Sequence, residues 1–284
     1  MQYVKLIGGL GNQLFQYAFA DFLLRKNKKV KLDKFCFDSY ILHKCSIQKF
    51  NCKIRFASWN EVSKYYLLKN ITFSNKLNFF SNKLYSMLSS IFIKGYISEN
   101  HIKEKKYNNY TYFDGFWQNL NYFSANRNSL IKIFKIKKVS KSHHKLIDKI
   151  KKDKKSVAIH IRVYSGKYSK FHGNLGKSYY TKAINKINSE INKPFFYIFS
   201  NNQDAIEKKI NLKEINYKII KKFKDFEDII SISTCRHQII SNSTFSWWGA
   251  WLNQNKNKIV IVPKKWILSN PQPKNLIPYS WFKF

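Results

Sequence analysis

The sequence predicts an α/β protein made of two Rossmann-like domains that face each other across a cleft. Its 284 residues suit two domains. In the second half, strand-like runs alternate with helix-like runs, which is typical of a parallel sheet with right-handed crossovers. Both halves also open with a strand that leads into a polar or Gly-rich turn. The expected N-terminal domain covers residues 1–150, and the C-terminal domain covers residues 151–284.

The N-terminal domain is expected to begin with a β-turn-α-β unit. Residues 3–7 are a short β-rich run that ends in Gly8, Gly9 and Gly11. The following "NQLFQYAFADFLLRK" has its apolar residues at helical spacing, and "KKVKLD" then predicts a second strand. Residues 58–141 are rich in Lys and Asn and have a helical character without a clear register, apart from an aromatic strand within 110–123.

The C-terminal domain has a clearer pattern. A basic stretch at 132–155 is interpreted as a linker. After it, strands are expected at 157–162, 195–200, 217–220, 238–241 and 258–262. Helices are expected at 178–191, 204–210, 225–235 and 245–253.

The composition limits the class of function. Lys and Arg number 52 against 16 Asp and Glu, a formal charge of +36. Such a charge favours nucleic acid, an acidic membrane face or phosphorylated substrates, although an AT-rich genome would also enrich Lys. The four cysteines form no C-x-x-C pair and the histidines form no H-E-x-x-H, so a zinc site is not expected. No signal peptide or apolar run of about 20 residues is visible, which predicts a soluble cytoplasmic protein.

The first motif, "GGLGNQLFQ", invites comparison with a dinucleotide-binding turn. Gly9-x-Gly11 follows a strand, and Asp33 lies 22 residues beyond Gly11. Leu14 stands where a third glycine belongs, which disfavours a nicotinamide enzyme. A plain β-α turn is one reading. The other is a ligand turn, because glycines let the backbone approach a ligand and the amides of Asn12 and Gln13 both donate and accept.

The second motif, "VAIHIRVYSGKY", places His160 and Arg162 at the carboxyl end of an expected strand, where ligands bind in open α/β sheets. Ile159 and Ile161 alternate with them, so the two polar residues share one face. A guanidinium offers a rigid fork of donors that suits a pyrophosphate. A histidine in a strand is otherwise usually a core residue.

The third motif, "SNSTFSWWGAWLN", sets a polar turn between a strand end and a helix start. Hydroxyls and unpaired backbone N–H groups could hold a phosphate there, while the aromatic residues that follow pack in the core. In "KDFEDIISIS", Asp228 could accept from the adjacent N–H donors of guanine, although capping explains the acidic cluster equally well. No D-x-D occurs, so a carboxylate-bound metal ion is not expected.

Together these motifs resemble glycosyltransferase family 11, the bacterial α-1,2-fucosyltransferases. The matching segments occur in family order over almost the whole chain: "GGLGNQLFQYAFA", "FDGFWQNLNYF", "VAIHIR", "YIFSNN", "FEDIISISTCRHQIISNSTFSWWGAWLN" and "VPKKW". The resemblance implies a GT-B fold and an inverting, metal-independent transfer of L-fucose from GDP-β-L-fucose to a galactoside 2-hydroxyl, with the donor in the C-terminal domain and the acceptor at the N-terminal domain.

The resemblance also implies roles for particular residues. The expected catalytic residues are Arg162, Asn12 and His160. The expected donor-binding residues are Arg162, Asp228, Asn242, Ser243, Thr244, Phe245 and Ser246, and the expected sugar-contacting residues are Gly11, Gln13 and Gln118. Asp21, Asp114 and His160 remain open as candidates for the general base. No cofactor or metal is expected, and the expected partners are GDP-fucose and a glycan acceptor, which a lipid could carry. The basic charge makes peripheral contact with an anionic membrane a further hypothesis, whereas nucleic acid is not an expected partner.

One departure from the family pattern leaves an alternative open. The family usually has H-x-R-R-G-D-Y, but in this chain Val163 follows Arg162 and the carboxylate is missing. The alternative is therefore an altered or inactive member that binds a GDP-sugar without transferring it, or that uses a different donor.

Overall fold

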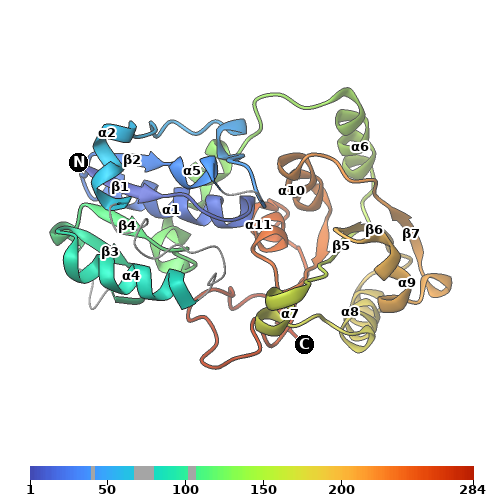
Figure 1. The fold of residues 1–284 in the computed structure, drawn as a ribbon. Helices are drawn as coiled ribbons and strands as arrows, with labels where there is room; N and C mark the ends of the chain where they lie inside the picture. Colours follow the sequence, from blue (N-terminus) through green and yellow to red (C-terminus); the bar gives the residue numbers. More distant parts are fainter. Residues whose placement is uncertain (40–41, 67–79, 102–106) are drawn as a thin grey trace. The chain divides into compact units, whose positions relative to one another are not determined.

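The computed structural model describes residues 1–39, 42–66, 80–101 and 107–284. The chain divides into two compact units, Met1–Lys135 and Ile136–Phe284 (Figure 1). Each unit is built on its own parallel sheet.

The first unit has a four-stranded sheet in the order β2-β1-β4-β3. Its strands are β1 (Gln2–Lys5), β2 (Val30–Asp33), β3 (Tyr96–Ser98) and β4 (Tyr112–Asp114). Its helices are α1 (Leu10–Arg25), α2 (Trp59–Val62), α4 (Phe80–Phe92) and α5 (Arg127–Ile133). Part of the middle region that showed a helical pattern, residues 67–79 and 102–106, lies outside the described residues.

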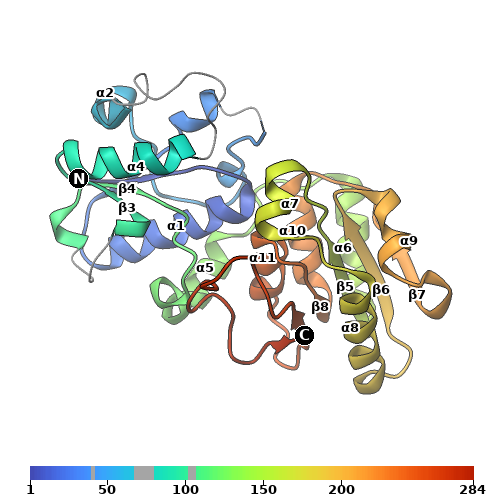
Figure 2. The ribbon, with the colours of Figure 1, turned by 60° about the horizontal axis from the view of Figure 1, so that its bottom comes forward.

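Helices α1 and α4 cover opposite faces of this sheet (Figure 2). On the α1 face, Phe19 packs between Phe113 of β4 and the fully buried Trp117, which it stacks at 4.0 Å. The other face is lined by tyrosines, which form a cluster of buried rings: Tyr3, Tyr65, Tyr66, Tyr96 and Tyr112. Because side chains alternate along a strand, Lys5 and Asp114 point to the tyrosine face.

The second unit has a six-stranded sheet in the order β10-β9-β8-β5-β6-β7. Its strands are β5 (Ser156–Ile161), β6 (Phe195–Ser200), β7 (Asn216–Ile219), β8 (His237–Ile239), β9 (Val260–Val262) and β10 (Phe282–Lys283). Its helices are α6 (Lys141–Lys152), α7 (Gly166–His172), α8 (Lys177–Glu190), α9 (Ile206–Lys209), α10 (Asp225–Thr234) and α11 (Thr244–Leu252). One apolar cluster joins α8 and α9 to the sheet, and a second joins α6 and α10.

The five strands and four helices expected after residue 155 are all present, within a few residues of their expected limits; the helix expected at 204–210 is the short 3₁₀ segment Gln203–Ala205 followed by α9. The linker interpretation of 132–155 was wrong, because this stretch contains α6. Leu146 and Ile150 of α6 are buried against the sheet and α10, so the second unit begins before residue 150. Helix α7 was also not expected from the sequence.

Candidate functional site

The edge at which β5 and β8 end collects the polar residues of the second unit. These two strands are hydrogen-bonded neighbours and run parallel, so their carboxyl ends meet. Arg162 follows β5 directly, and the turn at 240–243 joins β8 to α11. Ligands of open α/β sheets bind at such strand ends. The structure thus brings Arg162 and the polar turn to one edge, as the sequence predicts.

Arg162 is half-buried, and its guanidinium lies 5.3 Å from the centre of the Tyr164 ring. No carboxylate of the described residues forms an ion pair with it. A guanidinium without an acidic partner retains its capacity to bind an anion from outside the protein.

Tyr164 is itself fixed on two sides. Its hydroxyl donates to the backbone carbonyl of Asn242 at 2.8 Å, and its ring stacks on His172, the last residue of α7, at 4.5 Å. Burial and the charge of Arg162 lower the pKa of His172 to about 4, so this ring is neutral at physiological pH. The result is a layered arrangement of guanidinium, phenol ring and neutral imidazole.

The side-chain amide of Asn242 has an internal role. Its Nδ2 donates to the carbonyls of His172 and Trp266, at 2.8 and 3.3 Å, so it ties the end of α7 to the turn after β8. Its Oδ1 is buried and has no hydrogen-bond partner among the described residues. The side-chain amide of Asn201 likewise binds main-chain groups, those of Val163. Its Oδ1 accepts from the Val163 N–H at 2.8 Å, and its Nδ2 donates to the Val163 carbonyl at 2.9 Å.

Two of the serines in the turn face inward. The Ser246 hydroxyl is fully buried and donates to the carbonyls of Ser241 and Ser243. The buried Ser241 hydroxyl bonds His160 Nδ1 at 2.8 Å. Burial and the neighbouring Arg162 lower the pKa of His160 to about 3, which leaves its ring uncharged. His160 and Ser246 therefore support the strand end from inside, and neither is placed to contact a phosphate.

The first turn of α11 presents the groups that remain. Ser243 precedes the helix without a side-chain cap, and Thr244 and Phe245 are half-buried. The first backbone N–H groups of a helix have no partner within it and carry a partial positive charge. This turn, together with Arg162, gives the edge two independent sources of positive potential.

Asp228 lies in the first turn of α10. Burial raises the pKa of this carboxyl group to about 7, and the nearby charge of Glu227 adds to the rise. A weak hydrogen bond from the Phe223 N–H favours the charged form and so opposes it. A half-buried carboxyl group with few donors around it is poised to accept hydrogen bonds from a ligand.

In the first unit, the Gly-rich turn after β1 is held by Gln13. Gly8 has a φ of +82°, and a Cβ there would lie 2.7 Å from Asn12 Nδ2, so glycine is required. Gln13 is fully buried; its Nε2 donates to the carbonyls of Gly8 and Lys44, and its Oε1 accepts from the N–H groups of Ser46 and Ile47. All four hydrogen bonds of this amide are thus used internally, and Gln13 is not free to contact a sugar. Gly11 is likewise buried, in the first turn of α1.

Asn12 and Gln118 are brought together, as half-buried side chains joined by a 3.1 Å hydrogen bond from Gln118 Nε2 to Asn12 Oδ1. The loop that carries Gln118 is fixed by Glu99, whose Oε2 accepts from the backbone N–H groups of Phe116 and Trp117 at 2.7 and 2.9 Å. The loop after β4 and the turn after β1 therefore share one polar surface at the carboxyl edge of the sheet.

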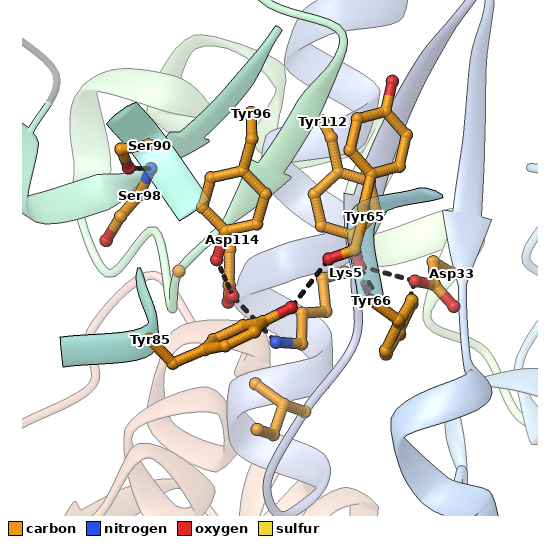
Figure 3. Close-up of polar contacts among 12 residues, drawn as sticks. Lys5, Asp33, Tyr65, Tyr66, Tyr85, Ser90, Tyr96, Ser98, Tyr112 and Asp114 are labelled. Carbon is orange, nitrogen blue, oxygen red and sulfur yellow. Dashed lines mark hydrogen bonds and ion pairs between the residues drawn. The ribbon is translucent and has the colours of Figure 1, made fainter. Parts of the chain in front are cut away.

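The tyrosine face of the same sheet carries a network of charged groups and tyrosines (Figure 3). Lys5 Nζ bonds Asp114 Oδ2 at 2.7 Å, and Tyr96 donates to the same oxygen at 2.5 Å. Burial alone would lower the pKa of Lys5, but the Asp114 carboxylate raises it above its usual value, so Lys5 stays charged. The neighbouring Asp33 accepts from the hydroxyls of Tyr66 and Tyr112, each at 2.6 Å.

Several of these residues could not have been found by motif. Tyr164 and His172 gain their role through α7, and Lys5 meets Asp114 only because β1 pairs with β4. The one available signal is position, since Lys5, Asp33 and Asp114 are each the last residue of a strand.

Two α/β units, each built on its own parallel sheet, are consistent with a GT-B-type fold. The sequence model of "Glycosyl transferase family 11" matches residues 1–275. The chain belongs to this family.

Two relatives from Escherichia coli are similar over nearly their full length. The chain is 30% identical to the "O-antigen biosynthesis glycosyltransferase WbnK", covering 98% of this chain and 99% of the relative. It is 31% identical to an "Alpha-1,2-colitosyltransferase", covering 92% of this chain and 91% of the relative.

Among solved structures, an Arabidopsis thaliana FUT1 variant in complex with GDP has a TM-score of 0.49 at 10% identity and covers 91% of this chain and 70% of that chain. Fucosyltransferase NodZ from Bradyrhizobium has a TM-score of 0.45 at 11% identity and covers 87% of this chain and 90% of that chain.

Proposed function

We propose that this glycosyltransferase transfers L-fucose from GDP-β-L-fucose to a galactoside 2-hydroxyl, with inversion and without a metal ion, during synthesis of a bacterial surface glycan. Colitose is the principal alternative sugar, because the relative at 31% identity is an α-1,2-colitosyltransferase. The relative named as an O-antigen biosynthesis glycosyltransferase supports a role in the synthesis of a surface glycan.

The observation that carries this proposal is Arg162 at the end of β5. In the transfer, the acceptor oxygen forms a bond to C1 of the sugar while the bond from C1 to the diphosphate oxygen breaks, and negative charge develops on the diphosphate. The Arg162 guanidinium, which forms no ion pair with a carboxylate of the described residues, and the uncapped first turn of α11 supply positive potential for that charge. The metal-independence rests on these groups. Among the described residues, no group of three or more His, Cys, Asp or Glu side chains that could hold a metal ion is present.

In this assignment the second unit binds the donor, with Asp228 at the guanine and Ser243, Thr244 and Phe245 at the diphosphate. Asn12 and Gln118 of the first unit contact the sugars. Asn242 acts indirectly, since its amide orders the end of α7.

The direct test is to incubate the protein with GDP-fucose or GDP-colitose and a panel of galactosides, with and without EDTA, and to determine the linkage of each product. An α-1,2 product with unchanged rate in EDTA supports the proposal. Tight binding of a GDP-sugar with no transfer to any acceptor would support the alternative of an inactive, GDP-sugar-binding family member.

The assignment of Arg162 is tested by Arg162→Ala. Loss of one preorganised donor to a developing charge costs about 10²- to 10³-fold in rate. The exposed Arg55 in the first unit provides a control, and Arg55→Ala should retain the wild-type rate. Turnover by Arg162→Ala near that of the wild type, with the protein folded, would refute the role.

We also propose that the exposed face of α6 contacts an anionic membrane surface. The buried face of α6 packs in the second unit, and its other face is exposed and basic: Lys141, Lys145, Lys149, Lys151 and Lys152. Each Lys near such a surface contributes about 1 kcal/mol. None of the helices in the described ranges has the length and apolar character needed to span a bilayer.

The membrane contact is tested by cosedimentation with phosphatidylserine vesicles. Substituting four of these lysines by Gln should reduce the bound fraction. The same change at exposed lysines elsewhere in the unit should reduce it less: Lys177, Lys182, Lys208 and Lys213. Equal losses would argue for a non-specific effect of net charge.

A further inference from the structure

We propose that Asp114 is the general base that deprotonates the acceptor hydroxyl, and that Lys5 and Tyr96 are the positioning residues that orient it. The inference rests on the proposed function, since it names the group that an inverting transfer to a hydroxyl requires. In the step, the acceptor O–H proton passes to Asp114 Oδ1, the acceptor oxygen bonds C1, and GDP leaves with the electron pair of the broken C1–O bond. The proton then passes to solvent.

The position of Asp114 is the first argument. It is the last residue of β4, and β4 and β1 are the two central strands of the first sheet. The segments that leave these two strands carry Gln118 and Asn12, which are hydrogen-bonded to each other. The crevice beyond the carboxyl ends of central strands is where an α/β sheet binds its ligand. Asp114 thus ends a central strand at the same carboxyl edge of the sheet from which the segments carrying Asn12 and Gln118 leave.

The geometry of the carboxylate is the second argument. Lys5 and Tyr96 both contact Oδ2 (Figure 3), and the side chain of Asp114 is 15% exposed. Oδ1 has no hydrogen-bond partner in the part of the chain that the structure describes. One oxygen is therefore held in place while the other is left to accept a proton. A group fixed in this way is preorganised for proton transfer.

The other candidates are placed unfavourably. Asp21 binds Arg25 and Asn126 and lies roughly 14 Å along α1 from Asn12. His160 is buried in the second unit and bonded to Ser241. Both oxygens of Asp33 are occupied, by two tyrosine hydroxyls and the Phe35 N–H, and its side chain is fully buried.

Glu99 is the remaining rival, because burial raises the pKa of its carboxyl group and it lies near the same surface. It follows β3, the edge strand, and its Oε2 is engaged by two backbone N–H groups of the loop after β4. Glu99 therefore fixes the position of that loop. The titratable groups that face Asp114 are Lys5 on β1, Tyr85 on α4, Tyr96 on β3, Tyr112 on β4 and Glu99.

The experiment compares two nucleophiles. Azide carries no proton and attacks C1 without a base, whereas a sugar hydroxyl needs one. With GDP-fucose as donor, Asp114→Asn should lose about 10²- to 10⁴-fold in transfer to a galactoside while azide transfer stays within a few-fold of wild type. Asp33→Asn is the matched control, because it disturbs the same network but should keep the wild-type ratio of the two reactions.

Further variants guard against a folding defect. Asp114→Glu keeps a charge beside Lys5 and should slow galactoside transfer about 10²-fold through misplacement, again with azide transfer preserved. In Tyr96→Phe the ratio of galactoside transfer to azide transfer should fall, because Asp114 Oδ2 loses one of the two groups that hold it. A merely structural tyrosine would not move it.

The results that would overturn the proposal are distinct from those that would overturn the function. Equal loss of both reactions in folded Asp114 variants, a normal galactoside rate in Asp114→Asn, or selective loss in Glu99→Gln instead would each refute the role of Asp114. If the wild-type protein transfers fucose to azide or to any galactoside, the proposal that it uses GDP-fucose as donor still stands. A wild-type protein that does neither refutes the proposed function itself.

Discussion

Removing the ring of Tyr164 should weaken the binding of the donor, although Tyr164 itself carries no charge. The centre of its ring lies 5.3 Å from the Arg162 guanidinium, its hydroxyl is anchored to the Asn242 carbonyl, and its ring stacks on His172. A cation-π contact contributes about 0.5 to 2 kcal/mol, more when desolvated, and the hydroxyl bond about 0.5 to 1.5 kcal/mol.

From these magnitudes, Tyr164→Leu should raise the KM for the GDP-sugar by about 5- to 400-fold, because both the stacking and the anchor are lost. Tyr164→Phe keeps the ring against the guanidinium and should recover most of that loss. The KM for the acceptor should stay near the wild-type value in both variants. Steady-state kinetics with each substrate varied in turn would measure these values, and calorimetric titration with GDP would report binding without turnover.

The chain offers a matched control on the same helix. Lys167 Nζ lies 5.6 Å from the centre of the Tyr168 ring, but this pair is exposed on α7 and outside the proposed site. Tyr168→Leu should therefore leave the KM for the donor unchanged. If Tyr164→Leu, like the control Tyr168→Leu, bound GDP with the affinity of the wild type, the view that Tyr164 orients Arg162 would have to be abandoned.

Two further predictions concern Asp228 and Gln13. Burial raises the pKa of Asp228 to about 7, and only the ionised form can accept from both N–H donors of guanine, so affinity for GDP-fucose should rise as pH increases from 6 to 8. Asp228→Asn should remove that dependence; titrations should use the GDP-sugar because the terminal phosphate of GDP itself ionises in this range. Gln13→Ala leaves buried backbone groups unpaired and should lower the free energy of unfolding by about 1 to 3 kcal/mol or more, measured in urea. The exposed Gln203→Ala should change it little, and equal effects would contradict the internal role of Gln13.

The alternation of strands and helices in the second unit was predictable because each element there has a strong apolar period. Helix α6 was missed because lysines dominate the composition of the stretch, although His143, Leu146, Ile147 and Ile150 are spaced as one buried helical face. Helix α7 has only seven residues and no buried residue, so its sequence carries no helical period.

The sequence predicted where the candidate site lies, but not how its side chains are oriented. Spacing placed Arg162 and the polar turn correctly at strand ends. It could not show which hydroxyls face inward, because at a strand-to-helix turn the direction of each side chain depends on the local backbone. Ser246 looked like a ligand and is instead satisfied by the carbonyls of the same turn. Lys5 and Asp114 are 109 residues apart in sequence, and only strand pairing unites them.

The pairing of Asn201 with Val163 has a consequence for how this family can vary. The side-chain amide of Asn201 binds only the main chain of residue 163, through one hydrogen bond to its N–H group and one to its carbonyl. Any amino acid except proline can offer those two groups, so the course of the chain beyond Arg162 does not depend on which side chain stands at 163. A valine can thus replace the second arginine of the usual motif while the main chain beyond Arg162 keeps its path.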